Sequence, residues 1–596
     1  MNRLGIRAAG VATVLGSVVA LMIVGQPATA AVPAPGGAAR PAPVDPTARA
    51  HSLARSAEQR THNVPNPLLK ELFAGGDDDE NADPTTVSAL CQSFLGHPSP
   101  FHGLAPNVDT INHDGTAPVG SAAGCSTPQN ETTVAVNPGN PRNIVEGAND
   151  YRIFNAREGR IDSSGWAYTS LDGGRTWKDV ELPKLDIQTG GTGALSFMDA
   201  AGDPAIAFGP QNTVYYATLV FSRAEVPDTQ QDPSGIAVSI SHNGGLTFGD
   251  PVIVHLDGVN PDGTPTPTSI FNDKEWITAD PHTGTVYVTW TQFTFDADGN
   301  FVDSPVVVSA SHDFGRTWSP LRQVSPDMST FTGGITSFGS GSNPRIGVDG
   351  TLYVAYETAV CQTADCDAPT DHDAVVMAIS HNGGRTFTNT EVALDFDFPF
   401  NADIGDSSLT GENFRINSFP QLAYDRLTNR LWITWADDRD GQYVNGESVR
   451  TNGDAFLVSS RDGVHWSAPA RIGSRSDEVF SAVAARAGRV AVSFYTRADD
   501  PHGVGLDYAF VSGNGDNVAR ASIRRITTQT SDPRVEFPVI GAESGQVLQG
   551  GFIGDYSAMD VGADFRLHPS WTDFRGSPGT TLPNQDVNTQ SISLLH

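Results

Sequence analysis

Several common functional signatures are missing from this sequence. No glycine-rich phosphate loop follows a strand and opens a helix, and the 15 histidines contain no His-Glu-x-x-His pattern. The stretch from Gly339 to Ser342 lacks the spacing of the serine hydrolase nucleophile turn. These absences argue against a nucleotide-binding enzyme, a zinc peptidase and a serine hydrolase.

Basic residues are also scarce. The chain has 37 Lys and Arg against 68 Asp and Glu, which gives a formal charge of −31. Such a charge argues against nucleic acid and anionic membrane surfaces as partners. The acidic excess is expected to keep an exported chain soluble, and calcium bound by some of the aspartates is the alternative. No other cofactor is expected.

The only long apolar run lies at the start of the chain. Arg3 and Arg7 precede an apolar stretch over residues 8–24, and Ala28-Thr29-Ala30 fits a small-residue cleavage site. This arrangement predicts a secretory signal over residues 1–30, no transmembrane helix and an extracellular protein. An Ala/Pro-rich linker and N-terminal extension are expected over residues 31–124.

Four cysteines are few for a secreted chain of this length, but export makes them candidates for disulfides. Four cysteines allow three connectivities. Cys361–Cys366 and Cys91–Cys125 are favoured, because the first closes a small loop and the second would tie down the N-terminal extension. Metal binding by these cysteines is less favoured, since no histidine accompanies them at zinc spacing.

What the sequence does contain is a repeat of eight residues. It begins Ser170-Leu-Asp172-Gly-Gly-Arg-Thr-Trp177, and near copies start at residues 241, 311 and 380, at steps of 71, 70 and 69 residues. A shorter fifth copy starts at Ser460. A fixed period of this length indicates a repeat architecture.

The residue types of the repeat predict a hairpin turn. Each copy follows one strand-like run and precedes another, Asp or Asn can bond its own backbone, and Gly supplies φ > 0 without strain. The pattern Ser-x-Asp-x-Gly-x-Thr-Trp resembles the Asp box of sialidases and related BNR-repeat proteins, over about residues 165–466. The resemblance implies a β-propeller in which these turns lie away from the active site.

The surrounding strand pattern predicts seven units over residues 125–596. In each unit a first strand leads through a tight turn to a second strand rich in Val, Tyr and Trp, with no helical period. Radial repetition of such units makes an all-β propeller. Seven blades are favoured, and six, the number in sialidases, is the alternative. The last unit is expected to lack its outer strand, which residues 105–128 would supply.

Propeller geometry predicts where chemistry could lie. Residues just before first strands and just after second strands should converge on one face, where ligand sites are built from a few polar groups. Candidate catalytic residues at these positions are Tyr556, Glu131, Asp203 and Asp273. Candidate substrate-binding residues are Arg152, Arg439, Arg497, Arg575 and Asp555. The alternative for each is a strand-end ion pair that only holds the ring.

The resemblance implies a sialidase mechanism, with an Asp acid/base, a Tyr nucleophile activated by Glu, and three Arg that clamp a carboxylate. Sialidases carry a Phe/Tyr-Arg-Ile-Pro motif before the first Asp box, and nothing similar precedes Ser170. The nearest string, Phe414-Arg415-Ile416-Asn417, follows the fourth copy and lacks the Pro. The candidate residues therefore come from predicted position and not from a motif match.

The function expected from these patterns is that of a secreted, monomeric exo-α-sialidase-like glycoside hydrolase acting on a glycan or glycoconjugate. A polysaccharide lyase and a non-catalytic carbohydrate- or protein-binding propeller are the alternatives. An arginine trio beside a Tyr–Glu pair would favour the hydrolase. Arginines that each pair with a neighbouring Asp, with no open pocket, would favour the binding module.

Overall fold

The structure is a computed structural model that describes residues 107–111, 127–326, 335–361, 372–444, 447–500, 503–542, 544–576 and 583–595. By its internal contacts the chain divides into Met1–Val44 and Asp45–His596, and the described residues all belong to the second unit. The predicted signal and linker and both favoured cysteine pairs involve residues outside the described ranges, so these remain predictions. No helix in the described ranges is long and apolar enough to cross a membrane.

The fold is all-β, and seven sheets of four or five antiparallel strands form the seven blades of a β-propeller. Val, Ile, Tyr and Trp fill the second strands and pack against the neighbouring sheets. The blades comprise β2 (Gln129–Val136), β3 (Ile144–Asn155), β4 (Arg160–Ser170) and β5 (Lys178–Glu181); β6 (Ala200–Phe208), β7 (Val214–Phe221), β8 (Ser234–Ser241) and β9 (Val252–Asp257); β10 (Ile270–Ala279), β11 (Val286–Phe295), β12 (Phe301–Asp303), β13 (Val306–Ser311) and β14 (Arg322–Gln323); β15 (Ile335–Ile346), β16 (Leu352–Cys361), β17 (His372–Ser380) and β18 (Thr388–Asp395); β21 (Gln421–Asp425), β22 (Arg430–Asp437), β25 (Asp454–Ser460) and β26 (Ala470–Ile472); β27 (Glu478–Arg486), β28 (Arg489–Thr496), β29 (Asp507–Asn514) and β30 (Arg524–Arg525); and β33 (Ala558–Val561), β34 (Arg566–Asp573), β35 (Asp586–Thr589), β36 (Ile592–Ser593) and β1 (Val108–Asp109).

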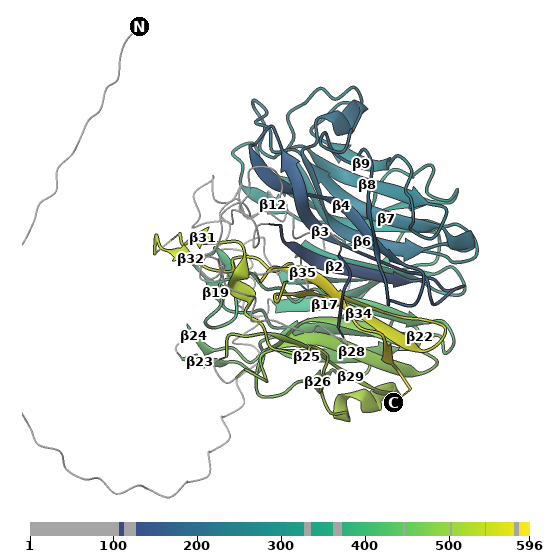
Figure 1. Cartoon of the computed structure of the whole chain (residues 1–596), viewed down its shortest axis with the longest axis vertical. Helices are drawn as coiled ribbons and strands as arrows, with labels where there is room; N and C mark the ends of the chain where they lie inside the picture. Colours follow the sequence, from purple (N-terminus) through teal and green to yellow (C-terminus); the bar gives the residue numbers. More distant parts are fainter. Residues whose placement is uncertain are drawn as a thin grey trace, which may run out of the picture. The chain divides into compact units, whose positions relative to one another are not determined.

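The first strand of each blade is the innermost, and it contacts the first strand of the next blade. The order of contact is β2, β6, β10, β15, β21, β27 and β33, and β33 returns to contact β2. In Figure 1 the C-terminal strands β34 and β35, in yellow, lie beside the dark blue β2. The seven units predicted from the strand pattern are thus confirmed, and the alternative of six blades is wrong.

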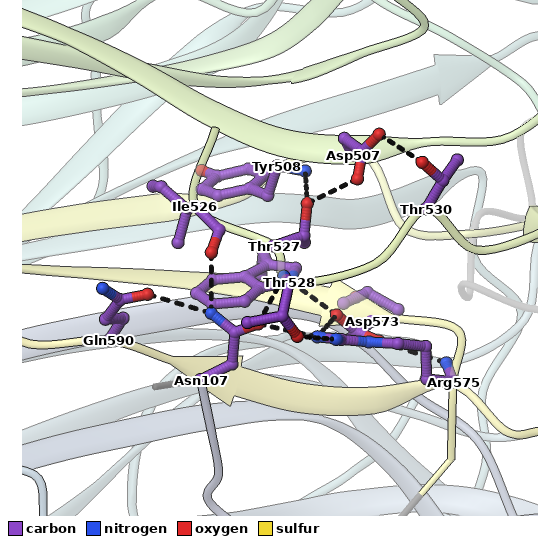
Figure 2. A network of polar contacts seen from close by, with 12 residues as sticks. Asn107, Asp507, Tyr508, Ile526, Thr527, Thr528, Thr530, Asp573, Arg575 and Gln590 are labelled. Carbon is purple, nitrogen blue, oxygen red and sulfur yellow. Dashed lines mark hydrogen bonds and ion pairs between the residues drawn. The ribbon is translucent and has the colours of Figure 1, made fainter. Parts of the chain in front are cut away.

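The ring is closed by a strand from the N-terminal side, as the sequence predicted. β1 pairs with β35 in antiparallel register and is the outermost strand of the last blade. Asn107, just before β1, bonds residues of both the sixth and the seventh blade (Figure 2). Its amide donates to the Ile526 carbonyl and to Gln590, each at 2.9 Å, and its side-chain oxygen accepts from the Thr528 N–H and from Arg575.

Replacing Asn107 with Ala is expected to lower the free energy of unfolding by about 2–4 kcal/mol, because buried partners on two blades lose their hydrogen bonds together. Denaturant unfolding of the whole chain measures this. Asn300→Ala is the matched control, since Asn300 bonds Asp296 in an exposed turn, and we expect it to cost under about 1 kcal/mol. Equal costs in the two variants would show that Asn107 does not hold the closure.

The repeated turns connect third to fourth strands and bind neighbouring blades together. In the first copy, Gly174 N–H donates to Ser170 Oγ and Thr176 N–H to Asp172 Oδ1, and the same bonds recur in the next three copies. Thr169 Oγ1 donates to the Gly245 carbonyl of the next blade. A Cβ at Gly245, where φ is +92°, would lie 2.6 Å from Val145 of the preceding blade. Glycine there allows both the turn and the close packing of blades.

Candidate functional site

The first strands share an irregularity where they begin. In five blades the pairing of first and second strands shifts by a bulge. One residue in each bulge has positive φ, namely Glu131 (54°), Asp203 (51°), Lys274 (54°), Gly341 (61°) and Phe480 (50°). Four of these are not glycine. Strained backbone held at equivalent positions around a ring is a mark of functional sites, and bulges re-aim side chains at such sites.

These bulges lie on the face where first strands begin and second strands end, which we call the entry face. The repeated turns lie on the opposite side, the turn face, where Gly173 N–H contacts the Arg142 carbonyl in the β2–β3 turn. On the entry face the bulge side chains of blades one to three are charged. We define the axial cluster as Glu131, Asp203, Asp273, Lys274, Arg415 and Asp555.

Lys274 is the centre of the axial cluster. Its Nζ lies 2.8 Å from Asp203 Oδ2 and 2.8 Å from Asp555 Oδ2, so these two oxygens are within twice that distance of each other. Glu131 Oε1 lies 3.5 Å and Asp273 Oδ1 3.9 Å from the same Nζ. Burial would lower the pKa of Lys274, but the four carboxylates outweigh it and raise this pKa well above its ordinary value.

Asp555 connects the cluster to a second cation. Arg415 donates to both of its carboxylate oxygens, at 2.8 and 2.6 Å, and Asp555 N–H donates to Glu131 Oε1 at 2.7 Å. Burial would raise the pKa of Asp555, but Arg415 and Lys274 outweigh it and hold this pKa well below its usual range. The two cations therefore favour the ionised form of Asp555.

Tyr556 lies next to the cluster. Its hydroxyl donates to the Pro204 carbonyl at 3.4 Å, and its ring packs edge-on against Trp276 with centroids 5.2 Å apart. A cavity of about 10 Å³ adjoins it, lined among others by Asn417, Phe480 and Asp555. That is room for about one water molecule.

The four predicted arginines have a different arrangement. Arg152, Arg439 and Arg575 each donate bidentately to an aspartate two residues earlier, at Asp150, Asp437 and Asp573. Arg497 pairs with Asp477 at 2.9 Å and donates to the Thr410 carbonyl. The pairs of Arg152, Arg439 and Arg575 with these aspartates lie at the strand ends of one blade, while Arg497 also has Glu412, which precedes the fifth blade, at 3.7 Å.

The structure therefore brings together Glu131, Asp203, Asp273, Asp555 and Tyr556, and it holds the four arginines in separate ion pairs. Lys274 and Arg415 were not among the sequence candidates. A signal for Lys274 existed, because it is one of only four lysines in the chain and stands two residues before the apolar run of a first strand, which begins at Trp276. A charge at that position must find buried partners.

In the described ranges, no three His, Cys, Asp or Glu side chains are arranged so that they could hold a metal ion. The carboxylates of the axial cluster have a lysine and an arginine as their cations. Structural calcium elsewhere in the chain remains a prediction.

No family model matches the sequence, and no curated protein matches it. Solved structures similar to this chain include the Hadza microbial sialidase Hz136 (12% identity, TM-score 0.40, covering 74% of this chain and 78% of that one). A Trypanosoma rangeli sialidase in complex with the inhibitor DANA has 11% identity, TM-score 0.35 and coverage of 70% and 57%. An α-L-arabinofuranosidase from Fusarium graminearum in complex with an iminosugar inhibitor has 9% identity, TM-score 0.34 and coverage of 65% and 93%.

Proposed function

We propose that this protein is an exported, monomeric glycoside hydrolase of the sialidase-like propeller type, acting on a glycan or glycoconjugate, with the axial cluster as its reaction centre. The repeated turns are, in this proposal, Asp boxes. The observation that carries the proposal is the convergence of four carboxylates around Lys274 at the entry face, with Tyr556 next to them in sequence after Asp555. Glycoside hydrolysis needs one carboxyl group to donate a proton and another group to stabilise or trap a cation-like transition state.

The distances from Lys274 suggest how these roles are divided. Asp203 and Asp555 lie closest to the lysine charge, each at 2.8 Å, and Asp555 also holds Arg415. In this proposal Asp203 is the carboxylate that stabilises positive charge on a sugar ring. Asp273 lies farthest from that charge among the four carboxylates, and in this proposal it is the acid. Tyr556, activated by Glu131, is the nucleophile in the proposal.

A sialic acid is the first substrate to consider. Arg415 is part of the axial cluster, and its side chain is 19% exposed, so a substrate carboxylate at the entry face would meet its guanidinium. Arg415 also holds an aspartate, Asp555, but unlike the four strand-exit arginines it belongs to the axial cluster. The clamp in this proposal therefore rests on Arg415 and Lys274.

The second candidate is a non-catalytic carbohydrate-binding propeller. Two observations favour it, namely the aspartate that each strand-exit arginine holds and the small room beside Tyr556. In the hydrolase proposal the segment over residues 415–419 has to move for a sugar to reach Asp555 and Tyr556.

A panel of fluorogenic aryl glycosides, led by a sialic-acid substrate, separates these functions. The proposal predicts release of the fluorophore by the folded parent chain, with the sialic-acid substrate turned over fastest. Turnover confined to another sugar would retain the hydrolase and exclude the sialidase. An unsaturated uronate product from polysaccharides would indicate a lyase, and glycan binding without turnover would indicate the binding module.

A further inference from the structure

The turn face has a cavity on the propeller axis, at the other end from the axial cluster. This axial cavity has a volume of about 240 Å³ and is lined by the first strands of all seven blades. Its lining is mixed, with apolar side chains such as Phe208, Trp276 and Ile346 beside polar groups. Pro138, at its rim, is exposed, so the cavity opens toward solvent on this face.

Two arginines contribute positive charge to the axial cavity. Arg345, on β15, donates to the adjacent Pro344 carbonyl at 2.7 Å. Within the part of the chain that the structure describes, no acidic side chain lies within ion-pairing distance of Arg345. Arg426 follows β21, donates to the Ile346 carbonyl at 3.1 Å and has Asp280 at 3.9 Å.

The carboxyl group that faces Arg345 is engaged elsewhere. Asp560, on β33, lines the same cavity, but its Oδ2 accepts the Val136 N–H at 2.8 Å and its Oδ1 the Val561 N–H at 2.7 Å. Burial lowers the pKa of Arg345 to about 10, while the charge of Asp560 acts in the opposite direction. Arg345 is thus a partly buried cation that Asp560 does not neutralise by contact.

Burying a cation costs free energy unless an anion forms an ion pair with it. The surrounding chain is strongly acidic, with a formal charge of −31, so an arginine pair on the axis is not part of a general basic surface. The combination of a guanidinium with apolar side chains in a pocket of this size fits a small organic ligand with an anionic group at one end.

We propose that the axial cavity on the turn face is a binding site for a small organic anion, a carboxylate or phosphate monoester on an apolar body. Arg345 binds the anionic group, Arg426 contributes at the rim, and the apolar body packs against the first strands near Trp276. This site is separate from the axial cluster and does not depend on the proposed hydrolase activity.

Calorimetric titration of the full chain tests the site with four probes: benzoate, phenyl phosphate, benzyl alcohol as the neutral counterpart of benzoate, and inorganic phosphate. Benzoate or phenyl phosphate is expected to bind about tenfold or more tightly than benzyl alcohol, because the charge-assisted bond to Arg345 is missing in the alcohol. Inorganic phosphate, without an apolar body, is expected to bind more weakly than phenyl phosphate. Equal binding of benzoate and benzyl alcohol, or no binding of either aryl anion, would overturn the proposal.

Variants locate the site. Arg345→Met is expected to weaken binding of the aryl anion about tenfold or more, and Arg345→Lys to retain part of it. Arg524→Met is the matched control, since Arg524 is also partly buried but lies on the outer strand β30 and bonds Ser512. Ala207→Phe fills the cavity without removing charge and is expected to abolish binding. Undiminished binding in a folded Ala207→Phe or Arg345→Met chain would overturn the assignment.

Discussion

Lys274→Met is expected to lower the free energy of unfolding by about 3–5 kcal/mol, because removing one partner of a buried ion pair leaves its carboxylates uncompensated. Asp203 and Asp555 each lose a contact of 2.8 Å, and both are buried. Methionine keeps the length and apolar stem of the side chain, so the change in packing is small. Denaturant unfolding near neutral pH measures the cost.

Lys184→Met is the matched control. Lys184 also contacts an aspartate oxygen, Asp250 Oδ2 at 2.7 Å, but both side chains are exposed. An exposed pair of this kind contributes at most about 1 kcal/mol. A cost for Lys274→Met no greater than that for Lys184→Met would show that the axial cluster is solvated and not a buried ion network.

The destabilisation caused by Lys274→Met is expected to depend on pH, and the direction follows from the two pKa shifts. The pKa of Asp555 is lowered in the folded chain, so its contribution is present above the unfolded value of about 3.9 and is lost as the pH falls through the folded value. The pKa of Lys274 is raised, so its contribution is present below about 10.4 and is lost only as the pH rises through the folded value. Without Lys274 the carboxylates take up protons more readily, so the cost of Lys274→Met is expected to be smaller at pH 5 than at pH 8.

Arg575→Ala is expected to have an effect on stability of similar size, about 3–5 kcal/mol. The Arg575 side chain is 1% exposed and donates bidentately to Asp573. It also donates to Thr528 and to Asn107 at the ring closure (Figure 2). Its loss leaves a buried carboxylate and weakens the contact between the last blade and β1.

Arg534→Ala is the control for this prediction. Arg534 and Asp532 have the same spacing and the same bidentate geometry, but their side chains are 38% and 29% exposed. We expect this variant to cost under about 1 kcal/mol. Similar stability of the two variants would contradict a structural role for Arg575. Loss of turnover in Arg575→Ala therefore has to be corrected for the amount of folded protein before it is taken as loss of a substrate contact.

Much of the architecture could be predicted because local chemistry determines it. The turn residues at Ser170 and its copies require Gly at fixed places, and the apolar first and second strands alternate with them in every unit. The outer strand at Val108 and Asp109 could be predicted from the incomplete last unit. These features depend on backbone conformation and strand pairing, which can be predicted from short stretches of sequence.

The site was harder to predict, because it depends on which charges meet in space. The predicted strand ends placed Arg152, Arg439 and Arg575 on the entry face. They did not predict that each arginine pairs with an aspartate two residues earlier. That spacing is visible in the sequence, and strand-exit geometry lets the two side chains fold onto each other. The partners of Lys274 come from three other segments of the chain, up to 281 residues apart from it, and no local pattern records such contacts.

The central claim is that the axial cluster is the reaction centre of a glycoside hydrolase. It is tested most directly by kcat/KM for the fastest substrate of the glycoside panel, measured for Asp203→Asn and Asp199→Asn at equal concentrations of folded protein. Asp199 is also buried and also paired with an arginine, Arg157, but it is not a member of the axial cluster. We predict a loss of about 100-fold or more for Asp203→Asn and little change for Asp199→Asn. Equal rates in the two variants, or a folded parent that turns over no glycoside, would contradict the account.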